Sequence, residues 1–189
     1  GVGKLLGNVT GLLLGKDVGA FAEQAKEYGA TEIRIWDDEN LSDFSPEMHS
    51  DCIAPYLRQG SFPLVIFPNS FRAKESAGML SVDLDVNLVT DVVALDAQAD
   101  GPALIQRPIF EGKAFETIEL VGQQNIITIR SRAFEAHKTE TKDGTITHET
   151  VKGNRTTKII SRSQPEKGVS LGNAKVVVTA GRGITNDPK

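Results

Sequence analysis

Apolar and polar positions in the first half of the chain alternate between strand-like and helix-like spacing. Asn8–Leu14 is a largely apolar run typical of a short strand, and the four consecutive apolar residues Leu64–Phe67 are typical of a strand covered on both faces. Thr31–Asp37 alternates between apolar and polar residues, as a strand does. Segments with apolar residues at every third or fourth position separate these runs. This order predicts a parallel sheet with helices on its faces.

Local signals predict where the helices begin and end. Asp17 can cap a short helix that Gly29 ends, and Ser45-Pro46 combines a cap with a first-turn proline. Asn69-Ser70 opens a third helix, which we expect to reach about Val82. The second helix is expected to bury the stripe Met48, Cys52, Ile53, Tyr56 and Leu57.

The pattern changes after Asn87, where strand-like runs follow one another without helices between them. The four runs are LVTDVVALDA, ALIQRPIF, KAFETIELV and NIITIRS, separated by turn signals such as Asp100-Gly101. We therefore expect consecutive antiparallel pairing in this part. The predicted fold class is α/β, a Rossmann-like three-layer domain with a mostly parallel sheet plus an antiparallel strand section.

The last third of the chain is more polar and predicts a change of domain. We interpret residues 137–172, rich in Thr, Lys and Glu and with an Asp143-Gly144 turn signal, as a connector with a mobile hairpin and one strand near residues 158–161. A new apolar strand is predicted at Val176–Val178. The predicted organisation is an amino-terminal α/β domain at 1–136, the connector at 137–172, and the beginning of a second domain at 173–189.

Composition argues against several classes of protein. The 189 residues carry a formal charge of −4, whereas binding to nucleic acid needs a basic surface that neutralises phosphates. No apolar run approaches the roughly 20 residues of a membrane span. Because GVGKLLG lacks the features of a secretory signal, we expect a cytoplasmic protein, or one of the mitochondrial matrix if the source is eukaryotic.

Few residues form a pattern typical of a catalytic or metal site. The histidines are scattered and Cys52 is the single cysteine, so zinc-type spacing is absent and a core thiol is the better interpretation of Cys52. Asp83, Asp85 and Asp91 could perform acid–base chemistry, but charges at element ends are usually solvated. Pro68-Asn69-Ser70 follows a strand at the edge where α/β sheets bind ligands, although a helix cap explains the serine equally well. We predict no catalytic residues and no metal.

The segment AKVVVTAGRGI, residues 174–184, has the layout of a ligand-binding loop. Gly181 and Gly183 allow the backbone to approach a ligand closely, and the guanidinium of Arg182 suits a phosphate or an electron-rich ring. A surface turn with a solvated arginine has the same sequence pattern.

This segment resembles the start of the flavin domain in alpha subunits of electron transfer flavoproteins. Other segments resemble the same family in the same order, namely GNVTGLLLG, FPNSFRAKESAGML, TDVVAL, QRPIFEGKA and ITIRSRAFEA. The resemblance covers nearly the whole chain. It implies an amino-terminal domain without a redox cofactor, followed by the beginning of the FAD-binding domain, with Thr179, Gly181, Arg182 and Gly183 as the FAD-binding residues.

The resemblance implies an electron carrier rather than an enzyme with its own substrate. Such an alpha subunit forms a heterodimer with a beta subunit, which holds AMP or, in bifurcating members, a second flavin. It takes electrons from flavoprotein dehydrogenases, as in fatty acid β-oxidation, and passes them through FAD to a quinone oxidoreductase or similar acceptor. The alternative is a module that binds a partner or an adenine nucleotide without redox chemistry.

The sequence departs from the family pattern at both ends. The family normally begins with an apolar strand and a long helix, of which GVGKLLG resembles only the last turn. Without that strand we expect a bare edge or a gap in the parallel sheet. Because most of the FAD domain is also missing, we expect this chain alone to bind FAD weakly or not at all.

Overall fold

The computed structural model describes residues 7–97, 101–139, 143–153, 155–161, 163, 171, 174–181 and 183. The chain divides into two units, Gly1–Lys158 and Ile159–Lys189. All helices and strands named below belong to the first unit.

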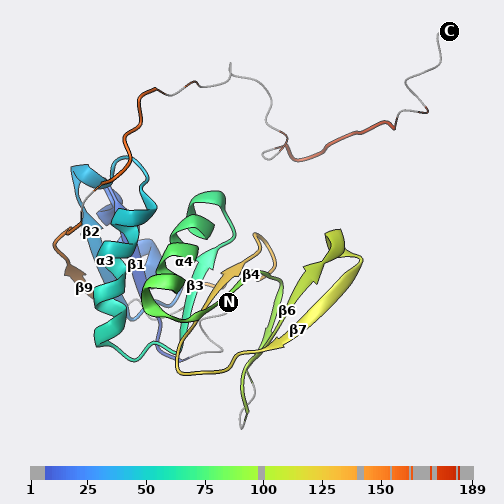
Figure 1. The fold of residues 1–189 in the computed structure, drawn as a ribbon, viewed down its shortest axis with the longest axis horizontal. Coiled ribbons are helices and arrows are strands. Elements are labelled where there is room, and N and C mark those ends of the chain that lie inside the picture. Colours follow the sequence, from blue (N-terminus) through green and yellow to red (C-terminus); the bar gives the residue numbers. More distant parts are fainter. Residues whose placement is uncertain are drawn as a thin grey trace. The chain divides into compact units, whose positions relative to one another are not determined.

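Parallel strands form two separate three-stranded sheets in this unit (Figure 1). The first has the order β1–β2–β9 and contains β1 (Thr10–Gly15), β2 (Glu32–Asp37) and β9 (Thr145–His148). The second has the order β3–β8–β4 and contains β3 (Leu64–Pro68), β8 (Asn125–Ile129) and β4 (Asn87–Val92). Within the described part of the chain, β1 and β3 each pair on one side only. Each therefore presents an open edge among the described residues.

Helices connect the parallel strands near the predicted positions. The short η1 (Val18–Phe21) and α2 (Ala22–Glu27) follow β1, and α4 (Phe71–Leu84) follows β3. Between β2 and β3 lie η2 (Glu39–Leu41) and α3 (Pro46–Gln59).

Two of the three predicted caps are formed. Ser45 Oγ accepts the N–H of Met48 at the start of α3, and Ser70 Oγ accepts that of Ala73 at the start of α4. The prediction is wrong for Asp17, whose side chain makes no capping bond. The reason is that its backbone has left-handed dihedral angles, with φ of 57°, whereas a capping residue is usually extended.

Apolar side chains on both faces of the parallel strands form the core. On one face, α3 and α4 pack against Val65 of β3 and Ile126 of β8. Leu12 and Leu14 of β1 contact the same cluster, so α3 and α4 bridge the two parallel sheets (Figure 1). The predicted α3 stripe faces inward, with Met48, Cys52, Ile53 and Leu57 buried and Tyr56 half-buried.

A third, antiparallel sheet packs beside the second parallel sheet. It has the order β5–β6–β7 and consists of β5 (Ala94–Asp96), β6 (Leu104–Ile109) and β7 (Ala114–Glu119), with η3 (Phe110–Gly112) between β6 and β7. Ile105 of β6 is buried against Ile127 of β8. The fold class is thus α/β with mostly parallel sheets, as predicted.

The expectation of consecutive antiparallel pairing holds for β5, β6 and β7 but is wrong for β4 and β8. These two strands pair in parallel, because β8 inserts between β3 and β4. The first four residues of β8 are buried, which suits a central strand covered on both faces.

Part of the predicted connector belongs to the first parallel sheet. Thr139 donates its N–H to the Glu27 carbonyl at 2.8 Å, and β9 then pairs in parallel with β2. A strand near residues 158–161 was expected instead, and that expectation is wrong. The difference arises because β9 has the free edge of β2 beside it, whereas Ile160 is 95% exposed with no strand to pair with among the described residues. The predicted domain boundaries at 136 and 172 stay predictions.

Candidate functional site

The residues predicted to contact a flavin lie in the second unit. Thr179, Gly181 and Gly183 are exposed, and Arg182 lies outside the described residues. A Cβ atom added at Gly181 or Gly183 would meet nothing within 4 Å. Within the second unit, the described residues thus leave open space beside these two glycines. The cofactor role of these four residues stays a prediction.

The strand predicted at Val176–Val178 is not formed. Val176 is 80% exposed and Val178 is 92% exposed. Extended backbone forms a β-strand only when a neighbouring strand exchanges backbone hydrogen bonds with it. No such neighbour exists among the residues that the structure describes.

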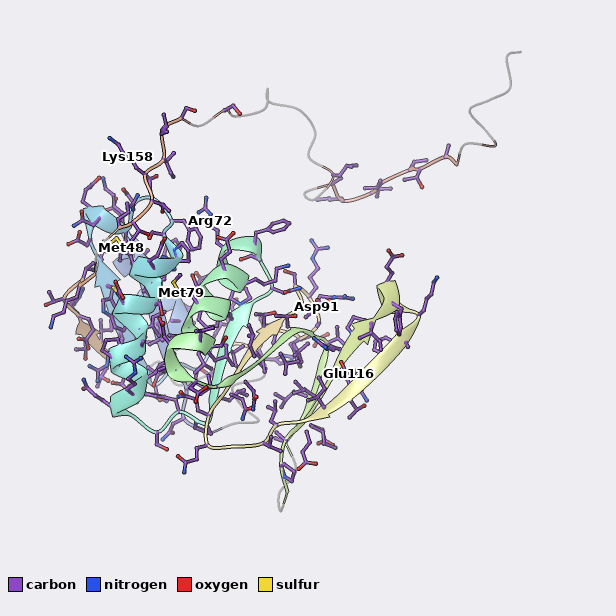
Figure 2. All side chains as sticks on the ribbon, in the orientation of Figure 1. Met48, Arg72, Met79, Asp91, Glu116 and Lys158 are labelled. Atoms are coloured by element: carbon purple, nitrogen blue, oxygen red, sulfur yellow. The ribbon has the colours of Figure 1, made fainter. Side chains whose placement is uncertain are left out.

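A polar cluster lies at the carboxyl ends of the second parallel sheet, where open α/β sheets place ligand sites. It consists of Asn69 after β3, Asp91 in β4, and Thr128 and Arg130 at the end of β8. We call these four residues the carboxyl-edge cluster. Figure 2 shows Asp91 at this edge, between α4 and the β6–β7 hairpin.

Five hydrogen bonds join the carboxyl-edge cluster. Arg130 donates from Nε and Nη2 to the two oxygens of Asp91, at 2.9 and 2.6 Å. Asn69 Nδ2 donates to Asp91 Oδ1 at 2.7 Å, and Thr128 Oγ1 donates to Asn69 Oδ1 at 2.9 Å. The backbone N–H of Asp91 donates to Thr128 Oγ1 at 3.0 Å. The ends of three strands are therefore tied together by side chains.

Backbone geometry directs Asp91 into this cluster. Its φ of 67° is left-handed, and the pairing of β4 with β8 shifts register between Val89 and Val92. A bulge of this kind re-aims a side chain at the end of a strand. Aspartate is among the few residues other than glycine that adopt this backbone conformation readily.

Electrostatics keep Asp91 ionised. The hydrogen bonds from Arg130 lower the pKa of the Asp91 carboxyl below its usual value, and partial burial only partly opposes this effect. A carboxylate held by two donors with a lowered pKa is a poor proton acceptor. The cluster therefore orders the edge of the sheet rather than performing acid–base chemistry.

The other two aspartates considered in the sequence do not meet Asp91. Asp83 lies near the end of α4 and accepts a short hydrogen bond from Ser50 of α3. Asp85 adopts a left-handed conformation directly after α4. Both therefore precede β4, whereas Asp91 lies toward its carboxyl end, and the three carboxylates form no common site.

Two potential nucleophiles are buried. His49 Nδ1 lies 3.2 Å from Ser76 Oγ, but Ser76 is 2% exposed and no substrate can reach its hydroxyl. Burial lowers the pKa of His49. Cys52 is 5% exposed and burial raises the pKa of its thiol, which supports the interpretation as a core thiol.

A groove of about 580 Å³ runs beside α3 and the end of β9. Arg34 contributes the central charge and pairs with Glu32 at 2.5 Å and with Glu149 at 2.6 Å. Its guanidinium also lies over the ring of Tyr56, 5.1 Å from the centroid. Two carboxylates compensate this arginine, so the groove is not suited to an anion.

Metal-ligand groups and membrane-spanning helices are both absent from the part of the chain that the structure describes. No group of three or more His, Cys, Asp and Glu side chains there could hold a metal ion. None of the helices that the structure describes is long and apolar enough to cross a membrane.

Sequence reasoning found half of the carboxyl-edge cluster. Asn69 and Asp91 were singled out separately, and Thr128 and Arg130 were missed. A usable signal for Thr128 is its position as a polar residue inside the apolar run NIITI, where a buried hydroxyl needs a partner.

Comparison with known proteins identifies a family. The model of the electron transfer flavoprotein domain matches residues 3–154. Electron transfer flavoprotein subunit alpha of Bacillus subtilis is 27% identical over 181 residues, covering 94% of this chain and 55% of the relative. The Pseudomonas aeruginosa subunit alpha is 27% identical over 189 residues, covering 95% and 57%. Protein FixB of Escherichia coli O127:H6 is 28% identical over 172 residues, covering 85% and 52%. The chain spans about half the length of the curated relatives it matches.

Proposed function

Because the chain belongs to the electron transfer flavoprotein family, we propose that it serves as the alpha-type subunit of an electron carrier that works through FAD. The observation that carries this proposal is the similarity to alpha subunits along nearly the whole chain. Because it covers 95% of this chain, that similarity continues past the first unit.

The proposed partner is a beta subunit that carries AMP or a second flavin. Electrons come from flavoprotein dehydrogenases and leave to a quinone oxidoreductase or a similar acceptor. In this arrangement the first unit is a scaffold without a redox group. Its carboxyl-edge cluster supports that role, because each member is occupied by structural hydrogen bonds.

The bound flavin would supply the redox chemistry, and this chain would supply part of its binding loop. Within the second unit, the described residues leave open space beside Gly181 and Gly183. A pocket usually buries about 70–90% of the surface of the ligand that it binds. We therefore expect the 189-residue chain alone to hold no stoichiometric FAD.

The test is to purify the protein from its native source and to record its visible absorption spectrum and subunit composition. We expect a flavin spectrum, FAD in the released cofactor fraction, and a second polypeptide in the complex. An Arg182→Ala variant of the same complex should retain less FAD, with the first unit still folded by circular dichroism. A colourless protein without a second subunit would contradict the proposal.

A further inference from the structure

The antiparallel sheet ends in a strand with one unpaired side. β7 (Ala114–Glu119) pairs with β6 over its whole length, and no described strand pairs with its other side. Figure 1 shows β7 at the outer side of this sheet, away from α3 and α4. The strand contains no proline and its register contains no bulge, although these features commonly prevent an edge from pairing.

Backbone hydrogen bonds show which residues of β7 point to this open edge. The carbonyl of Gln106 in β6 accepts the N–H of Val93, so it points toward β5. Directions alternate along an antiparallel pair, and Thr117 is the register partner of Gln106. Thr117 therefore directs its N–H and its carbonyl away from β6. Phe115 and Glu119 do the same, because each lies two positions from Thr117.

The residues that point to the open edge are also exposed. Phe115 is 62% exposed, and Thr117 and Glu119 are exposed as well. The residues of β1 from Thr10 to Leu14 are half-buried instead. A second strand can therefore approach the edge of β7 without displacing any described part of the chain.

Symmetry favours this edge for pairing between two copies of the chain. Identical edges related by a two-fold axis perpendicular to the sheet run antiparallel to each other. Such pairing continues the ladder of an antiparallel sheet, whereas β1 and β3 are edges of parallel sheets. β5, the other edge of the antiparallel sheet, contains only three residues. A second copy can therefore extend β7 in the same pattern.

The sequence of β7 is complementary to itself in one register. With Thr117 on the two-fold axis, Phe115 lies opposite Glu119 of the second copy. Threonine then lies opposite threonine, which is a favourable cross-strand pair, and the two Glu119 carboxylates do not face each other.

The remaining charge of β7 is compatible with this register. Glu116 points to the opposite face from Thr117, where its carboxylate pairs with Arg107 at 2.7 Å. Across the axis, Glu116 lies opposite Ile118 of the second copy. No like charges are therefore placed opposite each other on either face.

From this self-complementary edge, we propose that β7 pairs with β7 of a second copy of this chain, across a two-fold axis at Thr117. The two antiparallel sheets then form one continuous sheet, in which Phe115, Thr117 and Glu119 exchange backbone hydrogen bonds with the second copy. Two strand edges bury less area than a stable interface does, so the dimer is weak. This inference does not depend on FAD or on a second subunit.

The test is a disulfide at the proposed axis. A hydrogen-bonded antiparallel pair places its Cα atoms about 5.5 Å apart, within reach of a disulfide. Under mild oxidation of the 189-residue chain, Thr117→Cys should form a covalent dimer at least about tenfold faster than Gln106→Cys. Gln106 is the matched control, because it lies beside Thr117 on the same exposed face but one strand further from the axis, about 15 Å from its copy. The wild type, whose Cys52 is 5% exposed, should stay unlinked on non-reducing electrophoresis.

A mixing experiment tests the register. Phe115→Cys mixed with Glu119→Cys should form a disulfide between the two variants, whereas each variant alone leaves its thiols about 14 Å apart. Adding Thr117→Pro to both variants removes the outward N–H at the axis and leaves the pairing with β6 in place, so the disulfide should be lost. Circular dichroism checks that every variant is folded. Because the bond forms only at this edge, it distinguishes the contact from association at the open edge of β1.

Three results would overturn the proposal. The first is an equal rate of disulfide formation for Thr117→Cys and Gln106→Cys. The second is an equal rate for the mixed and the single variants of Phe115 and Glu119. The third is a Thr117→Cys thiol that a second polypeptide covers in the native complex while the isolated chain forms no covalent dimer, which would assign the edge to that polypeptide.

Discussion

At the scale of single residues, polar side chains at strand ends carry the most structural information. Asn69 and Thr128 are neutral, yet they determine how the charged pair of Asp91 and Arg130 is held. Removing one member leaves its partners without hydrogen bonds, which costs more than the bond itself contributes.

Asp91→Ala is therefore expected to lower the free energy of unfolding by about 2 kcal/mol. The change removes the acceptor for Arg130 and Asn69 and places alanine at a φ of 67°. Urea titration followed by circular dichroism measures the effect. Asp91→Asn tolerates the same backbone conformation and should cost less, about 1 kcal/mol, since Arg130 is partly exposed. An Asp91→Ala protein as stable as the wild type would show that the cluster is not structural.

His49 makes stability depend on pH in the mildly acidic range. Burial lowers its pKa, and the positive charge of Arg72 adds to this effect. The unfolded chain therefore binds a proton at a pH where folded His49 does not, and stability is lost as the pH falls below about 6.5. We expect the melting temperature of the wild type to fall as the pH is lowered from 7 toward the pKa of folded His49. His49→Gln should flatten this part of the profile, and an unchanged profile would exclude His49 as its source.

At the scale of elements, the capping residues directly before α3 and α4 show what burial adds to a cap. Ser45 and Ser70 both accept a backbone N–H through Oγ, but Ser45 is completely buried whereas Ser70 is exposed. Water can replace an exposed cap and cannot replace a buried one.

Ser45→Ala is thus expected to cost about 1–2 kcal/mol, and Ser70→Ala about 0.5–1 kcal/mol. The buried variant leaves the Met48 N–H without its partner and removes the donor to Glu47. Chemical denaturation of both variants, with Ser42→Ala as an exposed control, measures the difference. A larger loss for Ser70→Ala would show that burial does not decide the strength of these caps.

The β6–β7 hairpin contains strained backbone at its tip. Phe110 and Glu111 have φ values of 51° and 57°, which non-glycine residues seldom adopt, and Gly112 follows at 87°. Glu111→Gly should therefore raise the free energy of unfolding by about 0.5–1 kcal/mol. Gly112→Ala serves as the control in the opposite direction. The added Cβ would meet no atom within 4 Å, so any loss of stability comes from backbone strain alone. Destabilisation by Glu111→Gly in thermal melts would contradict this account.

At the scale of the whole first unit, the two parallel sheets present open edges. The carbonyls of Val9 and Gly15 accept N–H groups from Thr31 and Asp38, so odd-numbered residues of β1 face β2. Even-numbered residues therefore direct their N–H groups to the open edge, and Thr10 is the first of them within β1. Unpaired edges of apolar strands promote pairing between chains.

We expect the isolated chain to self-associate as its concentration rises, which light scattering after size exclusion detects. Thr10→Pro removes one outward N–H and leaves the pairing of odd-numbered residues with β2 in place, so it should shift the mass toward the monomer. Thr10→Val retains the N–H and should associate like the wild type. Equal association by both variants would mean that another surface is responsible.

The sequence by itself determined the local elements and the class of the fold. Periodicity, serine caps and unbroken apolar runs depend on neighbours a few positions away, so they predicted α3, α4, β2, β3 and the mostly parallel α/β fold. The quoted segments also determined the family. Tertiary structure alone decided that β8 lies between β3 and β4, that β9 extends the first sheet, and that Asn69, Asp91, Thr128 and Arg130 meet. These contacts join residues far apart in the chain, and strand order depends on which apolar surfaces can be buried together.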